Sequence, residues 1–503
     1  MKTFFRVLGG PVIIGLMMMV SFASPVSARP ISPNPLLLPK SPYSTSVLVA
    51  QGIHNGTIHL SGHGSGQGAT PNLNCTPAPC VFTNKRVSPG TQPVNETPIA
   101  ADPLTHSHLL TGGNDYNCAN LQGFYSSSTG GSSFTSTCMN NLPGQFGEGD
   151  PGVGYDTLHN SYITGIDSPN GSTGEIIFEK SSNNGGTWSA PAIAVNPFFP
   201  GGLTDKDWLQ IDDTIGSPHV NCLYISVTQF ASNNNSTITV SHSCNGGTTW
   251  TTVQVDTTQV FPAIDQFSDL AIDKNGNVFA SWMRCTANGP TGDCGGTTAT
   301  LVVSESTNGG ASFGTIHTIA KANLTPDSCG AFYGCLPGTG ERVSNIPSID
   351  LDRSSGVHSG NLYAAFYNWT GSQMQVKVAT STNSGTTWGA PVRVTTAGGD
   401  EFFPWLTVSK TGIVGATWND RRNGSGLSYE EFGALSNTGG ASFGTNFQLA
   451  SALSNPNNDG FGGGFMGDYS GNIWAGKKLY AVWTDTRSGP PASEWMGGIK
   501  NNA

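Results

Sequence analysis

Short apolar segments recur along the chain from about residue 97 to the C-terminus. One kind has a compact apolar core, and its copies stand at residues 97–102, 208–212, 268–273, 347–352 and 404–408. A second kind follows within a few residues, with examples at residues 277–284, 361–369 and 413–419. Both kinds are apolar at successive positions, which is typical of strands buried on both faces. The pattern therefore predicts many short strands in closely packed sheets.

A tight turn of eight residues punctuates these strands six times. Its copies occupy residues 127–134, 181–188, 243–250, 306–313, 381–388 and 436–443. Each copy has Ser first, Asn or Thr third, Gly fifth, Ser or Thr seventh and Phe or Trp eighth. The Gly permits a positive φ, the third residue can bond nearby backbone N–H groups, and the aromatic ring can anchor the hairpin by burial. These are scaffold roles, and we expect no catalytic residue in the turns.

The turns and strands together predict an all-β propeller of four-stranded blades, because each turn would join a third strand to a fourth. Seven first strands can be counted, the weakest near residues 152–157. The last unit, near Gly467, has no turn after it and lacks a fourth strand, which residues 82–87 could supply from the other end of the chain. Seven blades closed by an N-terminal strand are favoured, with six as the alternative.

The repeated turn resembles the Asp-box, or BNR, repeat of sialidase-like propellers, over residues 81–503. The third position departs from that repeat, since no copy has Asp there. The resemblance implies a protein that acts on glycans. In sialidases of this kind it also implies six blades, an arginine clamp for the substrate carboxylate, a Tyr nucleophile with a carboxylate partner, and an Asp acid/base. Residues 95–99 stand where the family has Phe/Tyr-Arg-Ile-Pro, and they contain no Arg.

The start of the chain indicates export. Residues 1–28 read as a signal peptide, with Lys2 and Arg6 before an apolar run and a small-residue cleavage site ending at Ala28. Residues 29–80 form a Pro-, Gly- and Ser-rich linker or extension, and residues 81–503 form the propeller. No second apolar stretch reaches spanning length, so we expect a secreted protein, extracellular or associated with the cell surface, without a membrane span in the mature chain.

The charge of the chain bears on its binding partners, and its cysteine content bears on disulfides. Only 11% of residues are charged and the net charge is -10, so nucleic acid is not expected as a partner. The ten cysteines indicate disulfides between neighbours in the sequence. The expected pairs are Cys75–Cys80, Cys118–Cys138, Cys222–Cys244, Cys285–Cys294 and Cys329–Cys335. No cofactor or metal site is predicted, although calcium could bind loop carboxylates.

Charged and aromatic residues collect on the loops opposite the turns, where a rigid scaffold presents binding groups. The candidate catalytic residues are Asp115, Asp207, Glu401, Asp468 and Tyr469. The candidate substrate-binding residues are Arg284, Arg342, Asp420, Arg421, Arg422, Asp485 and Arg487. A structural interpretation stands beside the functional one: each Trp–Asp–Arg segment could hold an ion pair that fixes its loop.

Three functions fit these residues. The first is an exo-α-sialidase-like glycoside hydrolase of extracellular glycans or glycoconjugates, with Arg forks for a carboxylate. The second is a glycosidase for neutral glycans that needs only two carboxyl groups, drawn from Asp207, Asp265, Asp400 and Asp468. The third is a non-catalytic propeller that binds glycan or protein.

Overall fold

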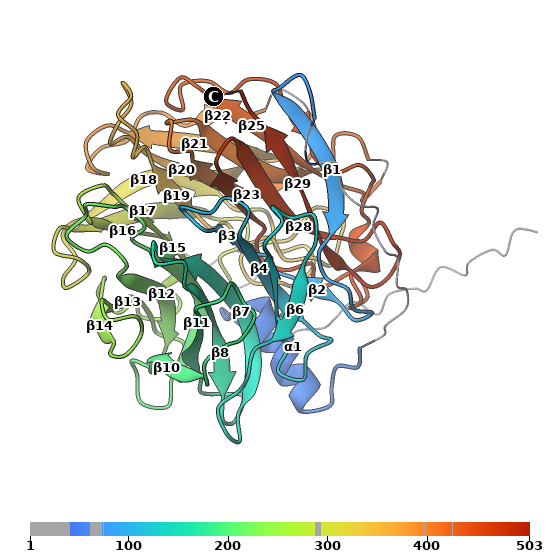
Figure 1. The fold of residues 1–503 in the computed structure, drawn as a ribbon. Coiled ribbons are helices and arrows are strands. Elements are labelled where there is room, and N and C mark those ends of the chain that lie inside the picture. Colours follow the sequence, from blue (N-terminus) through green and yellow to red (C-terminus); the bar gives the residue numbers. More distant parts are fainter. Residues whose placement is uncertain are drawn as a thin grey trace, which may run out of the picture. The chain divides into compact units, whose positions relative to one another are not determined.

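The computed structural model describes residues 41–60, 73, 75–286, 293–395, 398–424 and 426–502. All of them belong to one unit, residues 34–503. This unit is a seven-bladed β-propeller, and each blade is an antiparallel sheet built around four strands (Figure 1). The predicted signal peptide, residues 1–28, lies outside the described residues.

Six blades follow one another along the chain. The strands of each blade are given below in order from the innermost to the outermost. Blades 1 to 3 consist of β3 (Ile99–Ala101), β4 (Leu109–Asp115), β5 (Gln122–Ser127) and β6 (Thr135–Cys138); β7 (Phe146–Tyr155), β8 (Ser161–Ser168), β9 (Glu175–Ser181) and β10 (Ala192–Val195); and β11 (Leu203–Ile211), β12 (Leu223–Phe230), β13 (Ser236–Ser243) and β14 (Thr251–Gln254). Blades 4 to 6 consist of β15 (Ile264–Ile272), β16 (Val278–Cys285), β17 (Thr298–Ser306) and β18 (Ile316–Asn323); β19 (Ser348–Leu351), β20 (Leu362–Trp369), β21 (Met374–Ser381) and β22 (Val392–Arg393); and β23 (Glu401–Val408), β24 (Val414–Asp420), β25 (Glu430–Ser436) and β26 (Phe447–Gln448). The short β2 (Val94–Asn95) also pairs with β4.

The seventh blade joins the two ends of the propeller. Its inner three strands are β27 (Gly471–Ala475), β28 (Lys478–Asp485) and β29 (Ser493–Lys500), and its outer strand is β1 (Cys80–Arg86), which pairs antiparallel with β29. In Figure 1 the blue β1 lies beside the red β29. The predicted seven-blade ring with an N-terminal closing strand is confirmed.

The six repeated turns all connect a third strand to a fourth, as expected. In every copy the first-position Ser Oγ accepts the backbone N–H of the fifth-position Gly at 2.9 to 3.1 Å. The third-position side chain accepts the N–H of the seventh residue, as Asn308 does from Ser312 at 3.0 Å. Each fifth-position Gly has a positive φ, from 74° to 89°. The turns are thus closed by their own side chains, and their aromatic residues pack partly buried against the blades.

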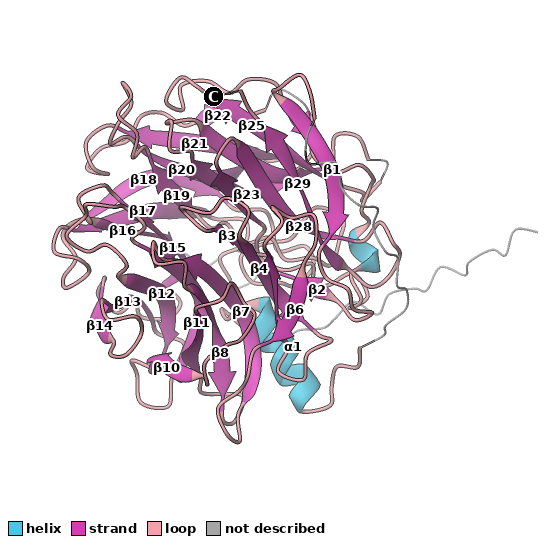
Figure 2. Cartoon of the chain, viewed as in Figure 1, coloured by secondary structure: helices cyan, strands magenta, loops and turns pink. Residues whose placement is uncertain are grey.

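All five predicted disulfides are present, and the described residues contain no free cysteine. Such a set fits an oxidising compartment. Within the described ranges, no helix is long and apolar enough to cross a membrane. Figure 2 shows how little helix accompanies the strands: α1 (Thr45–His54) and the 3-10 turn η1 (Pro456–Asn458).

A glycine substitution tests the role of the repeated turn. Gly385 has φ +74°, and a Cβ there would lie 3.2 Å from Val303 Cγ1. We expect Gly385→Ala to lower the free energy of unfolding by about 1–2 kcal/mol, because an L side chain disfavours this conformation. Gly389, four residues along, has no positive φ, and a Cβ there would meet nothing closer than 3.5 Å. Gly389→Ala should therefore change stability by less than about 0.5 kcal/mol. Equal effects in denaturant unfolding would contradict this account.

Candidate active site

The inner strands carry a repeated irregularity at their starts, on the side away from the turns. The pairing register shifts by a bulge in β7, β11, β15 and β23. At each bulge a residue other than Gly has a positive φ: Asp150, Lys206, Phe267 and Phe403, at 49° to 63°. Glu96, just before β3, has φ 54°. A bulge re-aims the side chains beside it, and here several of these side chains enter one buried polar cluster.

We call this group the central cluster. It contains five carboxyl groups and two cations, all from the starts of inner strands or the loops before them. Its members are Glu96, Asp150, Asp205, Lys206, Asp207, Arg342 and Asp468. Each is at most 5% exposed. Buried charges are costly unless they are paired and hydrogen-bonded, so the contacts of each group decide its charge.

Glu96 and Asp150 form a hydrogen-bonded pair of carboxyl groups. Burial raises the pKa of Glu96 well above its usual range, and the charges of Asp150 and Asp468 raise it further. Asp150 is surrounded by donors: it accepts the Lys206 backbone N–H at 3.1 Å and the hydroxyls of Ser44 and Ser46 at 2.9 Å each. Two adjacent carboxyls cannot both ionise cheaply. Burial and the neighbouring charges thus favour the protonated form of Glu96.

Asp205 and Asp207 flank Lys206 in β11. Burial raises the pKa of Asp205 to about 7 and that of Asp207 to about 8, and the nearby charge of Asp150 adds to both shifts. Thr164 donates to Asp207 at 2.6 Å. Burial lowers the pKa of Lys206, whose ammonium lies 4.6 Å from the ring centre of Trp208 and 4.3 Å from that of Tyr469. The cluster can therefore hold protons on carboxyl groups near neutral pH.

Arg342 and Asp468 form the ion pair of the cluster. Arg342 Nε donates to Asp468 Oδ1 at 3.0 Å, and the second guanidinium nitrogen donates to Oδ2. The third nitrogen donates to the backbone carbonyl of Tyr43 at 2.7 Å. This two-bond geometry fits a guanidinium–carboxylate fork, so the Asp468 carboxylate already occupies two donors of Arg342.

The N-terminal segment, residues 41–60, lies on the central cluster. Ser44 donates its backbone N–H to Asp205 at 2.7 Å, and the Thr45 N–H donates to Asp468 at 3.3 Å. The Pro42 carbonyl accepts from Tyr333 at 2.8 Å. The helix α1 follows directly, with Ser44 as its N-cap. Asp150 and Asp205 thus lie on either side of Ser44, one taking its hydroxyl and the other its N–H.

The predicted binding arginines, apart from Arg342, each pair with carboxylates of the loops around them. Arg284 pairs with Asp265 and Asp256, and Arg421 pairs with Asp400 at 3.1 Å. Arg422 and Arg487 pair with Asp420 and Asp485, and each of these Asp residues also accepts a Trp indole N–H two positions earlier in the sequence. These contacts are the ones that the structural interpretation predicts, in which an ion pair fixes each loop.

The predicted catalytic residues divide into two groups. Asp207, Asp468 and Tyr469 lie together at the centre, where Tyr469 donates its hydroxyl to the Pro151 carbonyl at 3.2 Å. Burial raises the pKa of Tyr469 well above its usual range, which keeps the phenol protonated. Asp115 instead accepts from Tyr125 at 2.7 Å, and Glu401 accepts from the Val376 N–H at 2.7 Å and from Thr395. The structure does not place these two among the residues of the central cluster.

Four central groups were not selected from the sequence: Glu96, Asp150, Asp205 and Lys206. Glu96, Asp205 and Lys206 lie in or beside blade starts that the sequence predicts. Their position in the sequence therefore indicated that they could belong to the site. Asp150 lies in β7, the inner strand with the weakest sequence pattern. The segment 41–60 gave no signal because it falls within the Pro-, Gly- and Ser-rich stretch 29–80.

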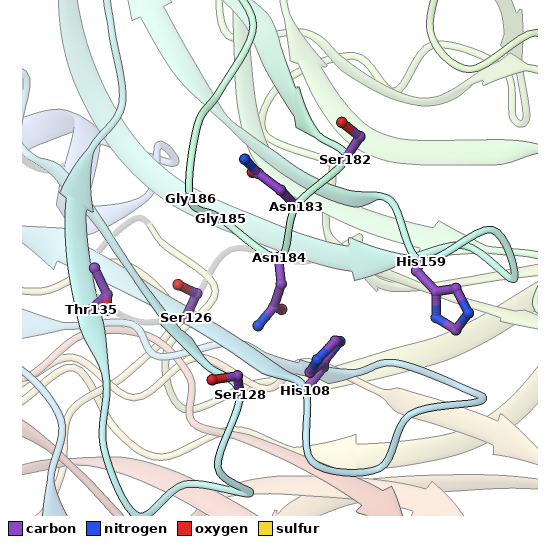
Figure 3. A pocket seen from close by; sticks show the side chains of 10 residues that line it. All are labelled: His108, Ser126, Ser128, Thr135, His159, Ser182, Asn183, Asn184, Gly185 and Gly186. Carbon is purple, nitrogen blue, oxygen red and sulfur yellow. The ribbon is translucent and has the colours of Figure 1, made fainter.

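A polar pocket lies on the turn face, between blades 1 and 2. Its volume is about 430 Å³, and Figure 3 shows Asn184 extending toward Ser128 and His108. His159 Nδ1 lies 2.7 Å from Asp102, a buried carboxylate that also accepts two backbone N–H groups of its own loop. These contacts close a turn and link two blades. Among the described residues the one His, Cys and carboxylate group compact enough for a metal is His219 with Cys222 and Cys244, and those two cysteines form a disulfide.

Comparison with known proteins adds similarities of fold. No protein-family model and no curated protein matches the chain. Among solved structures, a Dyadobacter fermentans protein of unknown function is 11% identical, covering 72% of this chain and 97% of that one, with a TM-score of 0.45. The intramolecular trans-sialidase of Ruminococcus gnavus is 11% identical (65% and 89% covered, TM-score 0.45). The Penicillium chrysogenum α-L-arabinanase is also 11% identical (70% and 92% covered, TM-score 0.45).

The pKa of Asp207 makes stability depend on pH. Burial raises this pKa to about 8, so the folded chain keeps a proton that the unfolded chain releases above pH ~4. The contribution of Asp207 to stability should therefore fall as pH rises from about 4 to about 8. Asp207→Asn cannot ionise, so its stability relative to wild type should rise by about 3–4 kcal/mol between pH 5 and pH 8. Urea unfolding at both pH values measures this difference.

Thr164→Ser is the matched control for this experiment. It changes the side chain that donates to Asp207 but keeps the hydroxyl, so its pH profile should run parallel to that of the wild type. If the Asp207→Asn profile is parallel as well, Asp207 is ionised in the fold at pH 5 and the assignment is wrong.

Proposed function

We propose that this chain is a secreted glycoside hydrolase that cleaves neutral glycans at the central cluster. The observation that supports this most is the position of Ser44 between Asp150 and Asp205. A hydroxyl and an N–H of this one small residue donate to the two carboxyl groups. A sugar presents hydroxyls of the same size and donor character to such a pair.

The pKa of Asp205 suits a division of roles between the two groups. Asp205, with a pKa of about 7, carries a proton below neutral pH and would protonate the oxygen of the leaving group. Asp150 would act as the carboxylate, either activating water or attacking the anomeric carbon. Glu96 would position Asp150 through their shared proton. Asp207 and Asp468, with Lys206 and Arg342, would line the sugar subsites.

We propose neutral substrates rather than sialic acids because the central cluster has too few free arginines. A clamp for a carboxylate substrate needs several free Arg forks facing one point. Arg342 is the one arginine of the central cluster, and its fork is bonded to Asp468. The protonated Tyr469 phenol also lacks the activation that a nucleophile requires. Export through the predicted signal peptide would place the enzyme where extracellular glycans occur.

Turnover of reporter glycosides tests the proposal. The full chain is incubated over a wide concentration range with nitrophenyl glycosides of neutral pentoses and hexoses, and with a sialyl reporter. We expect release from a neutral substrate and a loss of kcat of about 10²- to 10⁴-fold in Asp150→Asn and Asp205→Asn. Asp213→Asn removes a carboxylate that pairs with Arg353 away from the cluster, and should keep full activity. Release from the sialyl reporter alone, or unchanged activity in both central variants, would refute the proposal.

A further inference from the structure

The seven blades are complete without residues 41–60. The closing strand β1 begins at Cys80, which the Cys75–Cys80 disulfide secures. In the described chain, α1 belongs to no sheet and pairs with no strand. The N-terminal segment therefore contributes no blade, and its contacts with the propeller are those of a docked element.

The docked segment places polar groups on the cluster and apolar groups around it. Ser44 and Ser46 share the Asp150 carboxylate, and their hydroxyls lie 2.8 Å apart. Val49 packs with Tyr116, Phe461 and Phe465 at the edge of the cluster. Adjacent hydroxyls on a carboxylate, flanked by an apolar surface, are the contacts that a sugar ring makes with a protein.

The fit between segment and cluster is incomplete. One carboxyl oxygen of Asp205 and one of Asp207 are buried without a hydrogen-bond partner within the described part of the chain. Buried polar atoms are almost always paired, and a ligand with more hydroxyls than Ser44 and Ser46 would pair them. The cluster thus has capacity for hydrogen bonds that its own segment leaves unused.

We propose that residues 41–60 are an autoinhibitory segment that competes with glycans for the central carboxylates. The ligand class rests on the proposed function, whereas the competition itself does not. Tethering holds the segment at a high effective concentration over the cluster. A glycan binds only to the fraction of molecules in which the segment has left, so its apparent affinity is reduced by that fraction. Signal-peptide cleavage at the predicted site after Ala28 would leave the segment attached.

Two variants of the full chain release the segment by different means. Ser44→Ala with Ser46→Ala removes the two hydroxyl donors to Asp150, and Val49→Asp places a charge in the apolar contact of α1. Asn55→Ala changes an exposed residue of the same segment and serves as the control. None of these residues belongs to the central cluster.

Hydrogen exchange gives a readout that does not depend on turnover. We expect the amides of Ser44 and Thr45, which donate to Asp205 and Asp468, to exchange at least about tenfold faster in both releasing variants. A synthetic peptide of residues 41–60 added to Val49→Asp should slow exchange at the starts of β7 and β11, which carry Asp150 and Asp205. Unchanged protection in both folded variants, or no effect of the peptide, would overturn the proposal.

Kinetics with the neutral reporter complete the test. Both releasing variants should lower KM by about tenfold or more with little change in kcat, because only the competent fraction changes. If no variant turns over any glycoside while exchange and peptide behave as expected, the glycosidase assignment fails and the competition stands. If turnover occurs with the same KM in all variants, the segment does not compete and the glycosidase assignment stands.

Discussion

Seven inner strands share one axis, and the limited room at that axis governs the rest of the structure. Each inner strand is enclosed by its own blade and by its neighbours, so a side chain at its start loses contact with water. The bulges in β7 and β11 then bring Asp150 and residues 205–207 from two blades into one space. Carboxyl groups that lie close together and are shielded from solvent retain protons that they would release in water. Burial is accordingly the first cause of the raised pKa values of Glu96, Asp205 and Asp207.

The same shortage of water explains why the chain supplies donors of its own. Asp150 is stabilised by a backbone N–H and two Ser hydroxyls, and two of those three donors come from the N-terminal segment. The ammonium of Lys206 lies over the faces of Trp208 and Tyr469, which attract it without adding another anion, and it donates to the Asp207 backbone carbonyl at 3.4 Å. In the proposed function such a cluster would bind hydroxylated ligands, and the N-terminal segment would compete with them for the same carboxyl groups.

The rim of the propeller shows how similar residues acquire different roles. Trp418, Asp420 and Arg422 repeat in form as Trp483, Asp485 and Arg487. In both copies the Asp carboxylate accepts the indole N–H and pairs with the Arg. The charge of each Arg is therefore paired with a carboxylate two positions earlier in the sequence. Arg342 and Asp468 are instead joined across two blades at the axis. Residue type alone does not separate these two situations.

The sequence by itself determined the scaffold: seven blades, closure by β1, six side-chain-closed turns and five disulfides. The turns, strands and disulfides follow from local rules, because each depends on residues close together in the chain. The closure by β1 follows from the count of strands, since the last unit lacks a fourth strand. It also indicated the face on which Asp207, Asp468 and Arg342 lie. Only the tertiary structure decided that Glu96, Asp150 and Asp205 join them, that Asp115 and Glu401 bond elsewhere, and that residues 42–46 cover the cluster. Those outcomes depend on distances between residues up to several hundred positions apart, which are set when the ring closes and the segment docks.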